Sequence, residues 1–150
     1  MLRVLKAFFP AVFAAYVLAS LLATQVILHD LVVMGVEVDL ETRLRASLHD
    51  LLGLASTYLL LVLLAFLLAM PAAAALVRLH LIPGSRSLWF SLAGLAALVL
   101  LNVIMRQLLG VWPLAAARDW SGLLLQGFAG AVGGYLYARL SQRRPRQLFR

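Results

Sequence analysis

The residues of this sequence best suited to chemistry are polar side chains that interrupt long apolar runs. Asn102 and Arg106 are four residues apart, so in a helix they would share one face. Gln126 lies in the last apolar run, and Gln25 lies near the end of the first. An arginine guanidinium flanked by amides can bind a carboxylate or a phosphate in two places at once. The set therefore indicates a polar pocket that can receive an anionic group.

Two interpretations of this set remain open. In the first, an outward-facing pocket binds a lipid headgroup and a carboxylate serves as the counter-ion of the arginine; its candidate residues are Gln25, Asp30, Asn102, Arg106, Asp119 and Gln126. In the second, Arg106 extends to the outer headgroups, and the amides join neighbouring helices at about 0.6–2 kcal/mol each. We favour the second, because Arg106 is only about one helical turn from Gly110, within reach of the interface.

Other kinds of chemistry are disfavoured by what the sequence lacks. There is no cysteine, which removes thiolate nucleophiles, disulfide relays and cysteine-ligated metal clusters. No Asp or Glu lies inside an apolar run, although proton-coupled transporters commonly need one there. His29, His49 and His80 fall at or beyond the ends of the runs, and no serine has a histidine at matching depth. We therefore expect no cofactor, metal or catalytic residue, and we favour a non-enzymatic protein.

The last apolar run carries the most specific packing signal. Gly122, Gln126, Gly130 and Gly134 recur there at every fourth position, and Gly130 with Gly134 forms a GxxxG pair. Such a stripe lets another helix backbone approach closely. The predicted packing residues are Gly122, Gly130, Gly133 and Gly134. Their partner is a helix of the same chain or of a second copy, and we favour the same chain because a small bundle needs at least one close crossing.

The elements that position these residues follow from composition and from the charge-free runs. The 150 residues are 64% hydrophobic and only 13% charged, far from the composition of a soluble domain. Four runs without charge are each long enough to cross a bilayer as a helix. They predict a single transmembrane domain, 1–150, folded as an all-helical bundle with four spans at 7–29, 51–79, 87–109 and 119–139. Pro71 predicts a kink in the second span.

Charge placement orients this bundle. Nine of the thirteen Lys and Arg residues fall on one side of the four spans, and all six carboxylates fall on the other. By the positive-inside rule the basic side is cytoplasmic, so we expect both termini inside, in a bacterial inner membrane. The basic tail, 140–150, is interpreted as part of this signal, with contact to anionic lipid as the alternative. The net charge of +7 therefore reflects topology, and we expect no nucleic-acid partner.

The longest predicted connection, the external loop 30–50, has a helical signal of its own. A set of leucines recurs at helical spacing directly after Asp39, which suits an N-cap: Leu40, Leu44, Leu48 and Leu51. Glu41 and Arg45 form a favourable i,i+4 pair. We predict a short amphipathic helix that lies on the outer interface or runs into the second span. We expect this helix to cover the outer end of the bundle. The alternative is that it forms a surface that binds a partner protein or senses lipid.

Three classes of function remain compatible with the sequence. We favour a non-enzymatic scaffold or accessory subunit of a membrane complex, because few polar groups lie in the spans and one span carries a packing face. An oligomeric channel or transporter would need Asn102, Arg106 and Gln126 to line a path. A lipid-binding or lipid-modifying protein would need an outward-facing pocket around Arg106. The expected partners are membrane lipids and a second copy or another membrane protein, bound through the last span.

Overall fold

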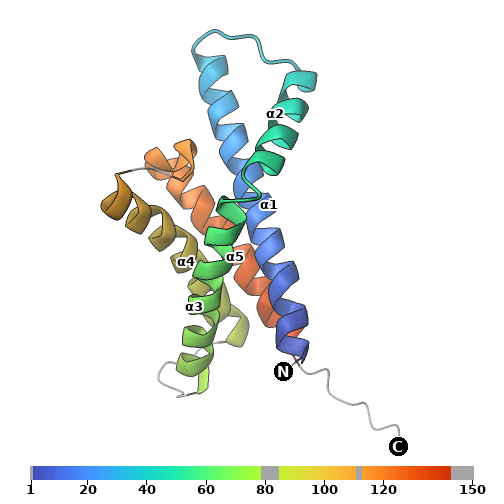
Figure 1. The fold of residues 1–150 in the computed structure, drawn as a ribbon, viewed down its shortest axis with the longest axis vertical. Coiled ribbons are helices and arrows are strands. Elements are labelled where there is room, and N and C mark those ends of the chain that lie inside the picture. Colours follow the sequence, from blue (N-terminus) through green and yellow to red (C-terminus); the bar gives the residue numbers. More distant parts are fainter. Residues whose placement is uncertain (1, 79–84, 111–112, 143–150) are drawn as a thin grey trace, which may run out of the picture.

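The computed structural model describes residues 2–78, 85–110 and 113–142 (Figure 1). Of these residues 88% are helical and none forms a strand, which confirms the predicted all-helical class for the described part of the chain. The elements are α1 (Leu2–Val33), α2 (Leu40–Gly53), α3 (Tyr58–Arg78), α4 (Arg86–Leu109), η1 (Ala115–Arg118) and α5 (Trp120–Ser141). His80 and the tail residues 143–150 lie outside the described residues.

Three of the helices are long and apolar enough to cross a membrane, over Val4–Val33 in α1, Tyr58–Arg78 in α3 and Arg86–Leu108 in α4. The helix α5 has 22 residues, but five glycines and Gln126 between Gly122 and Gly134 take the place of apolar side chains. It is not among the helices that meet this criterion within the described ranges. The structure therefore offers three candidate spans and a fourth long helix.

The helix α5 is packed between α1 and α4 (Figure 1). A methyl group added at Gly130 would overlap the carbonyl oxygen of Gly94 on α4. On the neighbouring face, a methyl group at Gly133 would crowd Ala15 of α1. Backbones approach this closely only where a side chain is missing on at least one helix. The small residues of α5 thus set the spacing of the bundle.

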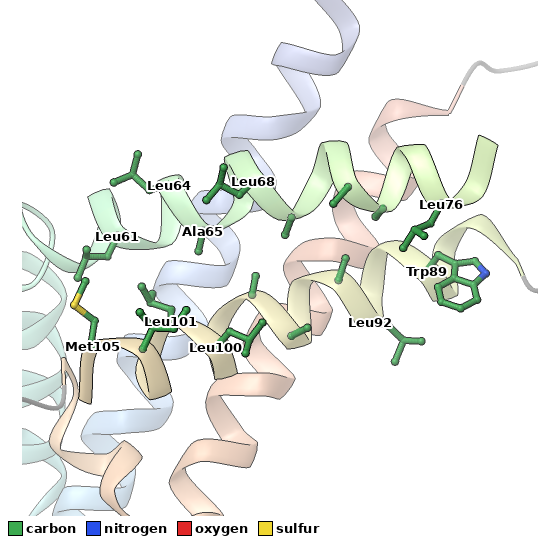
Figure 2. Close-up of a pocket in the computed structure, with 17 residues that line it drawn as sticks. Leu61, Leu64, Ala65, Leu68, Leu76, Trp89, Leu92, Leu100, Leu101 and Met105 are labelled. Atoms are coloured by element: carbon green, nitrogen blue, oxygen red, sulfur yellow. The ribbon is translucent and has the colours of Figure 1, made fainter. Parts of the chain in front are cut away.

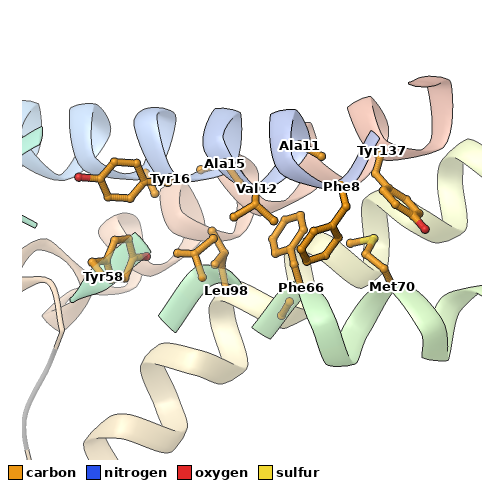
Figure 3. Packing of buried hydrophobic residues seen from close by; sticks show 14 of the residues in the cluster. Phe8, Ala11, Val12, Ala15, Tyr16, Tyr58, Phe66, Met70, Leu98 and Tyr137 are labelled. Carbon is orange, nitrogen blue, oxygen red and sulfur yellow. The ribbon is translucent and has the colours of Figure 1, made fainter. Parts of the chain in front are cut away.

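The helices α1 and α3 face each other across a row of apolar side chains (Figure 3). Tyr16 and Tyr58 lie at one end of this row, with ring centroids 6.3 Å apart, and Phe8 and Met70 lie toward the other. The buried residues of α3 are Tyr58, Val62, Phe66, Met70 and Ala73. This spacing places them on a single face of the helix, and the rest of α3 is partly buried or exposed.

The helix α1 extends beyond the other helices, and α2 folds back along this extension (Figure 1). Asp39 is the N-cap of α2 and accepts the Thr42 N–H at 2.9 Å. Hydrogen bonds from the Thr42 side chain and backbone lower the pKa of the Asp39 carboxyl. The amphipathic helix predicted in the external loop is therefore present, and it forms an antiparallel hairpin with α1.

The predicted second span, 51–79, is divided in the structure. The helix α2 continues through Leu51 and ends at Gly53, a turn follows, and α3 begins at Tyr58. The absence of charge does not mark this break, although Gly53, Ser56 and Thr57 within the run are residue types that favour helix ends. The helix α3 then continues through Pro71 to Arg78.

The two ends of the bundle differ in charge. We call one the basic end, because it carries Lys6, Arg78, Arg86 and Arg139, and the other the acidic end, because all six carboxylates of the chain lie there. The helices α1 and α4 both begin at the basic end, and the helices α3 and α5 both end there. Polar features are described below relative to these two ends.

Candidate functional site

A small cluster of buried polar side chains joins the four long helices in the half of the bundle nearer the acidic end. The Tyr58 hydroxyl of α3 donates a hydrogen bond to Oε1 of Gln126 on α5 (3.1 Å). Nε2 of Gln126 donates to the main-chain carbonyl oxygen of Ala19 on α1 (3.0 Å). Asn102 of α4 lies beside the same tyrosine. Gln126 and Asn102 are fully buried, and Tyr58 is 1% exposed.

This cluster links neighbouring helices through hydrogen bonds. Both polar atoms of the Gln126 amide are bonded, one to α3 and one to α1. Loss of either bond would leave a buried polar group unpaired, at about 1–3 kcal/mol. In an apolar environment such bonds fix the register of neighbouring helices, because no solvent is present to replace them.

Two polar atoms near the cluster have no hydrogen-bond partner within the described ranges, Ser20 Oγ and Asn102 Oδ1. Both residues are fully buried. Asn102 uses its Nδ2 group to donate to the Leu98 carbonyl oxygen (2.9 Å), one turn earlier in α4. A buried polar atom without a partner has a cost in free energy, so these two positions are the least satisfied part of the core.

The structure gathers two of the six predicted pocket residues, Asn102 and Gln126, at this cluster. The other four are exposed at the surface: Gln25, Asp30, Arg106 and Asp119. Gln25 bonds to α2 instead, since its Oε1 accepts from Arg43 (3.1 Å) and its Nε2 donates to Ser47 (3.2 Å). The six residues are thus divided between the bundle core and its surface rather than gathered in one pocket.

Polar contacts also fasten α2 to α1. The Thr24 hydroxyl lies between the Asp50 carboxylate (2.8 Å) and the Ser20 carbonyl oxygen (3.0 Å). The Tyr16 hydroxyl donates to the carbonyl oxygen of Leu51. The polar edge of α2 therefore faces α1, and its leucines are exposed, at 60–73%: Leu40, Leu44, Leu48 and Leu52.

The four predicted packing glycines all lie at close contacts within the chain. Gly130 and Gly134 meet the α4 backbone at Gly94 and Phe90. Gly133 faces α1, and Gly122 packs against the carbonyl group of Ala116 in η1. Added methyl groups at these four sites would meet other helices or the η1 turn, so the glycine stripe is used within this chain.

Sequence reasoning missed Tyr58, the residue that links α3 to the cluster. A single tyrosine at the start of a run of leucines was the available signal, because its ring tolerates an apolar setting while its hydroxyl needs a partner when buried. The sequence alone gives Ser20 no role, because no histidine lies at a matching depth. Its position one residue from Ala19, whose carbonyl group accepts from Gln126, becomes visible only after the helices are packed.

A long apolar groove of about 620 Å³ runs between α3 and α4 (Figure 2). Leu76 and Trp89 lie at its basic end, and Leu61 and Met105 lie at its acidic end. Its lining consists of Ala, Leu, Ile, Met and Trp side chains only. Between the larger side chains the floor is made of alanines: Ala65, Ala69, Ala72 and Ala73 from α3, and Ala93, Ala96 and Ala97 from α4. This surface is therefore suited to packing against another apolar surface.

No group of three or more His, Asp or Glu side chains gathers in a way that could hold a metal ion within the part of the chain described. The fold is that of an all-helical protein with three helices suited to crossing a membrane, compatible with the multi-pass class of membrane proteins. Comparison of the chain with known protein families, with curated proteins and with solved structures gives no match.

Proposed function

We propose that this protein is a non-enzymatic accessory subunit of a membrane complex in the bacterial inner membrane. In this proposal the chain crosses the bilayer four times, with both termini in the cytoplasm. The groove between α3 and α4 receives an apolar transmembrane helix of a partner protein. The observation that carries the proposal is the length and wholly apolar lining of this groove.

The packing of α5 supports four spans. Gln126 bonds to Ala19 near the middle of α1, and Gly133 contacts Ala15 farther toward the basic end. A helix that lies along the middle of α1 shares the hydrocarbon core with it if α1 crosses the bilayer. The low apolar content of α5 is compatible with that depth, because its glycines face α1, α4 and η1 rather than lipid.

The charge distribution supports the orientation. The positive-inside rule assigns the basic end to the cytoplasm. Trp120 is 83% exposed at the acidic end, and Trp89 lies at the basic end of the groove. Tryptophan is enriched at both interfaces of a bilayer, so these two residues are compatible with spans of about membrane thickness.

The length of the groove favours a helix as its occupant. Trp89 and Met105 are sixteen residues apart, which corresponds to about 24 Å along α4. The hydrocarbon core is about 30 Å thick, so a lipid chain anchored in one leaflet reaches only about half of that depth. A transmembrane helix would follow the groove along its whole length.

The alanine floor favours the same occupant. In lipid, helices associate through close packing rather than through burial of apolar surface from water. Small residues permit that approach, and alanines on two neighbouring helices offer a furrow for the larger side chains of a third. The leucines of the rim, of which Leu68 is 76% exposed, provide further contact.

The polar side chains support a role without catalysis. The buried polar residues of the described ranges are Ser20, Thr24, Asn102 and Gln126. Thr24 and Gln126 are bonded within the chain, and Phe66 and Leu98 are completely buried beyond the cluster toward the basic end. A transport path would need polar groups through that region as well.

Site-specific photo-crosslinking in native membranes tests this proposal. A benzophenone side chain in place of Leu68, on the rim of the groove, should give a single protein adduct of constant added mass. The same probe in place of Leu124 on α5 should give lipid adducts only, because Leu124 is 70% exposed but does not line the groove. The Leu68 adduct should disappear when Ala72→Phe fills the groove.

Ala75→Phe is the matched control for the filled groove, since Ala75 is an exposed alanine of the same helix that lies outside the lining. It should leave the Leu68 adduct unchanged. Lipid adducts alone at Leu68 would contradict the proposal, as would an adduct that persists in Ala72→Phe. An adduct with the mass of a second copy of this chain would show that the groove receives a helix of that copy and not a helix of another protein.

A further inference from the structure

We infer that a second groove, formed by α4 and α5 at the basic end, binds one anionic phospholipid. The groove has a volume of about 370 Å³. Its wall from α4 includes Ser87, Ser91 and Leu95, and α5 contributes Ala131 and Tyr135. The inference is independent of the partner helix proposed above, because that helix would occupy the α3–α4 groove.

The lining changes from polar to apolar along the depth of the bundle. Ser87, Ser91 and Leu95 recur every fourth residue and so lie on one face of α4, with the serines nearer the basic end. Ser85 and Leu95 are ten residues apart, which corresponds to about 15 Å, half of a hydrocarbon core. Hydroxyl groups at the mouth and aliphatic groups below match the headgroup and acyl chain of a lipid in one leaflet.

Close packing of the two helices supplies the base of this groove. Gly94 of α4 lies in backbone contact with Gly130 of α5, and Gly134 packs against Phe90. Leu92 of α4 lies between the two grooves and lines both of them. The rigid crossing thus holds the two walls at a fixed separation, which suits a single acyl chain.

A cation is fixed at the mouth of the groove. Nε of Arg139 donates to the Tyr135 hydroxyl (2.7 Å), and the guanidinium lies 5.2 Å from the centroid of the same ring. This bond uses Nε, and an arginine has further donors on its terminal NH₂ groups that can bind phosphate oxygens. The neighbouring Arg86 is held by Ser141 (2.8 Å) and adds positive charge at the same level.

Charge complementarity selects an anionic lipid over a zwitterionic one. Every carboxylate of the chain lies at the acidic end, so no Asp or Glu of this chain competes for Arg139. The phosphodiester would contact Arg139, Tyr135 and the serine hydroxyls, and one acyl chain would follow Leu92 and Leu95. A zwitterionic headgroup would bring its own cation close to Arg139, which disfavours it.

Native mass spectrometry of the purified full chain, with phosphatidylglycerol and phosphatidylcholine of identical acyl chains in equal amounts, tests the inference. The wild-type protein should retain one phosphatidylglycerol per chain in preference to phosphatidylcholine. Arg139→Gln should lower this retention about tenfold, the factor expected for loss of a charged hydrogen bond. Ser91→Leu should lower it as well, because leucine occupies the groove without changing the charge.

Lys6→Gln is the matched control, since Lys6 is an exposed cation at the same end that lies outside the groove. It should change retention by less than about twofold, as expected for a diffuse surface charge. Equal losses in Lys6→Gln and Arg139→Gln would overturn the inference, and so would equal retention of the two lipids. If Arg139→Gln does not fold, unchanged retention in Ser91→Leu overturns it alone. Failure of the Leu68 crosslink would leave these outcomes unaffected.

Discussion

The helices α3 and α5 are of similar length but stand in opposite relations to their surroundings. The helix α3 is the most apolar in the bundle, yet it buries only five residues on one face. The helix α5 falls short of the apolar content of a candidate span, yet it buries nine residues, five of which are glycines. The more apolar of the two helices is thus the one that leaves more of its surface outside the bundle. Apolar content does not measure how deeply a helix lies within the bundle.

The physical reason is that a side chain on the outside of a membrane bundle and a side chain between two helices have different surroundings. A lipid-facing side chain must be apolar, and its size matters little. A side chain between helices must be small, and it can be polar if a neighbouring helix bonds to it. Substitutions in α5 should therefore be costly where equivalent substitutions in α3 are tolerated.

Gly130→Val should give the largest effect. The added side chain would overlap the Gly94 carbonyl group and force α4 and α5 apart. We expect a loss of about 3 kcal/mol or more in the free energy of unfolding, measured by thermal or denaturant unfolding in detergent micelles. Gly53→Ala is the control, because a methyl group there meets nothing within 4 Å. A Gly130→Val protein as stable as the wild type would remove the proposed role of the α4–α5 crossing.

Gln126→Leu should give an intermediate effect. The substitution keeps the volume but leaves the Tyr58 hydroxyl and the Ala19 carbonyl group without their partner. We expect about 1–3 kcal/mol of destabilisation in the same unfolding assay. Gln107→Leu, at an exposed glutamine of α4, should be nearly neutral. Equal stability of the two variants would show that the cluster does not tie the helices together.

Leu68→Ala should have the smallest effect on stability. Leu68 is 76% exposed on the outer side of α3, and its truncation opens no cavity in the core. We expect a change within about 0.5 kcal/mol in the purified protein. Phe66→Ala, two residues away and completely buried, serves as the contrasting variant and should be clearly destabilising. A similar cost for both would break the distinction between the two faces of α3.

A pH effect is expected at the N-terminus of α2, where Asp39 is the cap. The Thr42 side chain and backbone hold the pKa of Asp39 below its ordinary value, so the folded protein favours the charged carboxylate. Capping is therefore complete above the ordinary aspartate pKa and is lost as the pH falls through the lowered one. A carboxyl carbon NMR titration should show this pKa rising toward the ordinary value in Thr42→Ala. An unchanged pKa in Thr42→Ala would contradict the assigned cause.

The apolar runs predicted the long helices well, because span length depends only on residue type along the chain. Residue depth within each run also indicated that Asn102 and Gln126 lie at similar levels. Depth does not reveal which way a side chain points around the helix. For this reason the sequence did not show that Arg106, one turn from Asn102 in α4, would be exposed while the two amides are buried.

The orientation of α2 depends on three-dimensional contacts that the sequence pattern does not contain. Its leucine stripe predicted an apolar face but gave no information on what the polar edge would bind. In the structure Arg43 and Ser47 bond to Gln25, and Asp50 bonds to Thr24. Hydrogen bonds between residues about twenty positions apart thus decide which edge of the helix faces α1.

Sidedness of two single cysteines tests the central claim, that α5 crosses the membrane inside the bundle despite its low apolar content. The chain contains no cysteine, so Glu37→Cys and Gln142→Cys each give one label site. Glu37 follows α1, and Gln142 follows α5. With four spans, an impermeant thiol reagent should label these two sites from opposite sides of the membrane, and Gln142→Cys from the cytoplasmic side. Labelling of both sites from the same side would show that α5 does not cross, and would contradict the account.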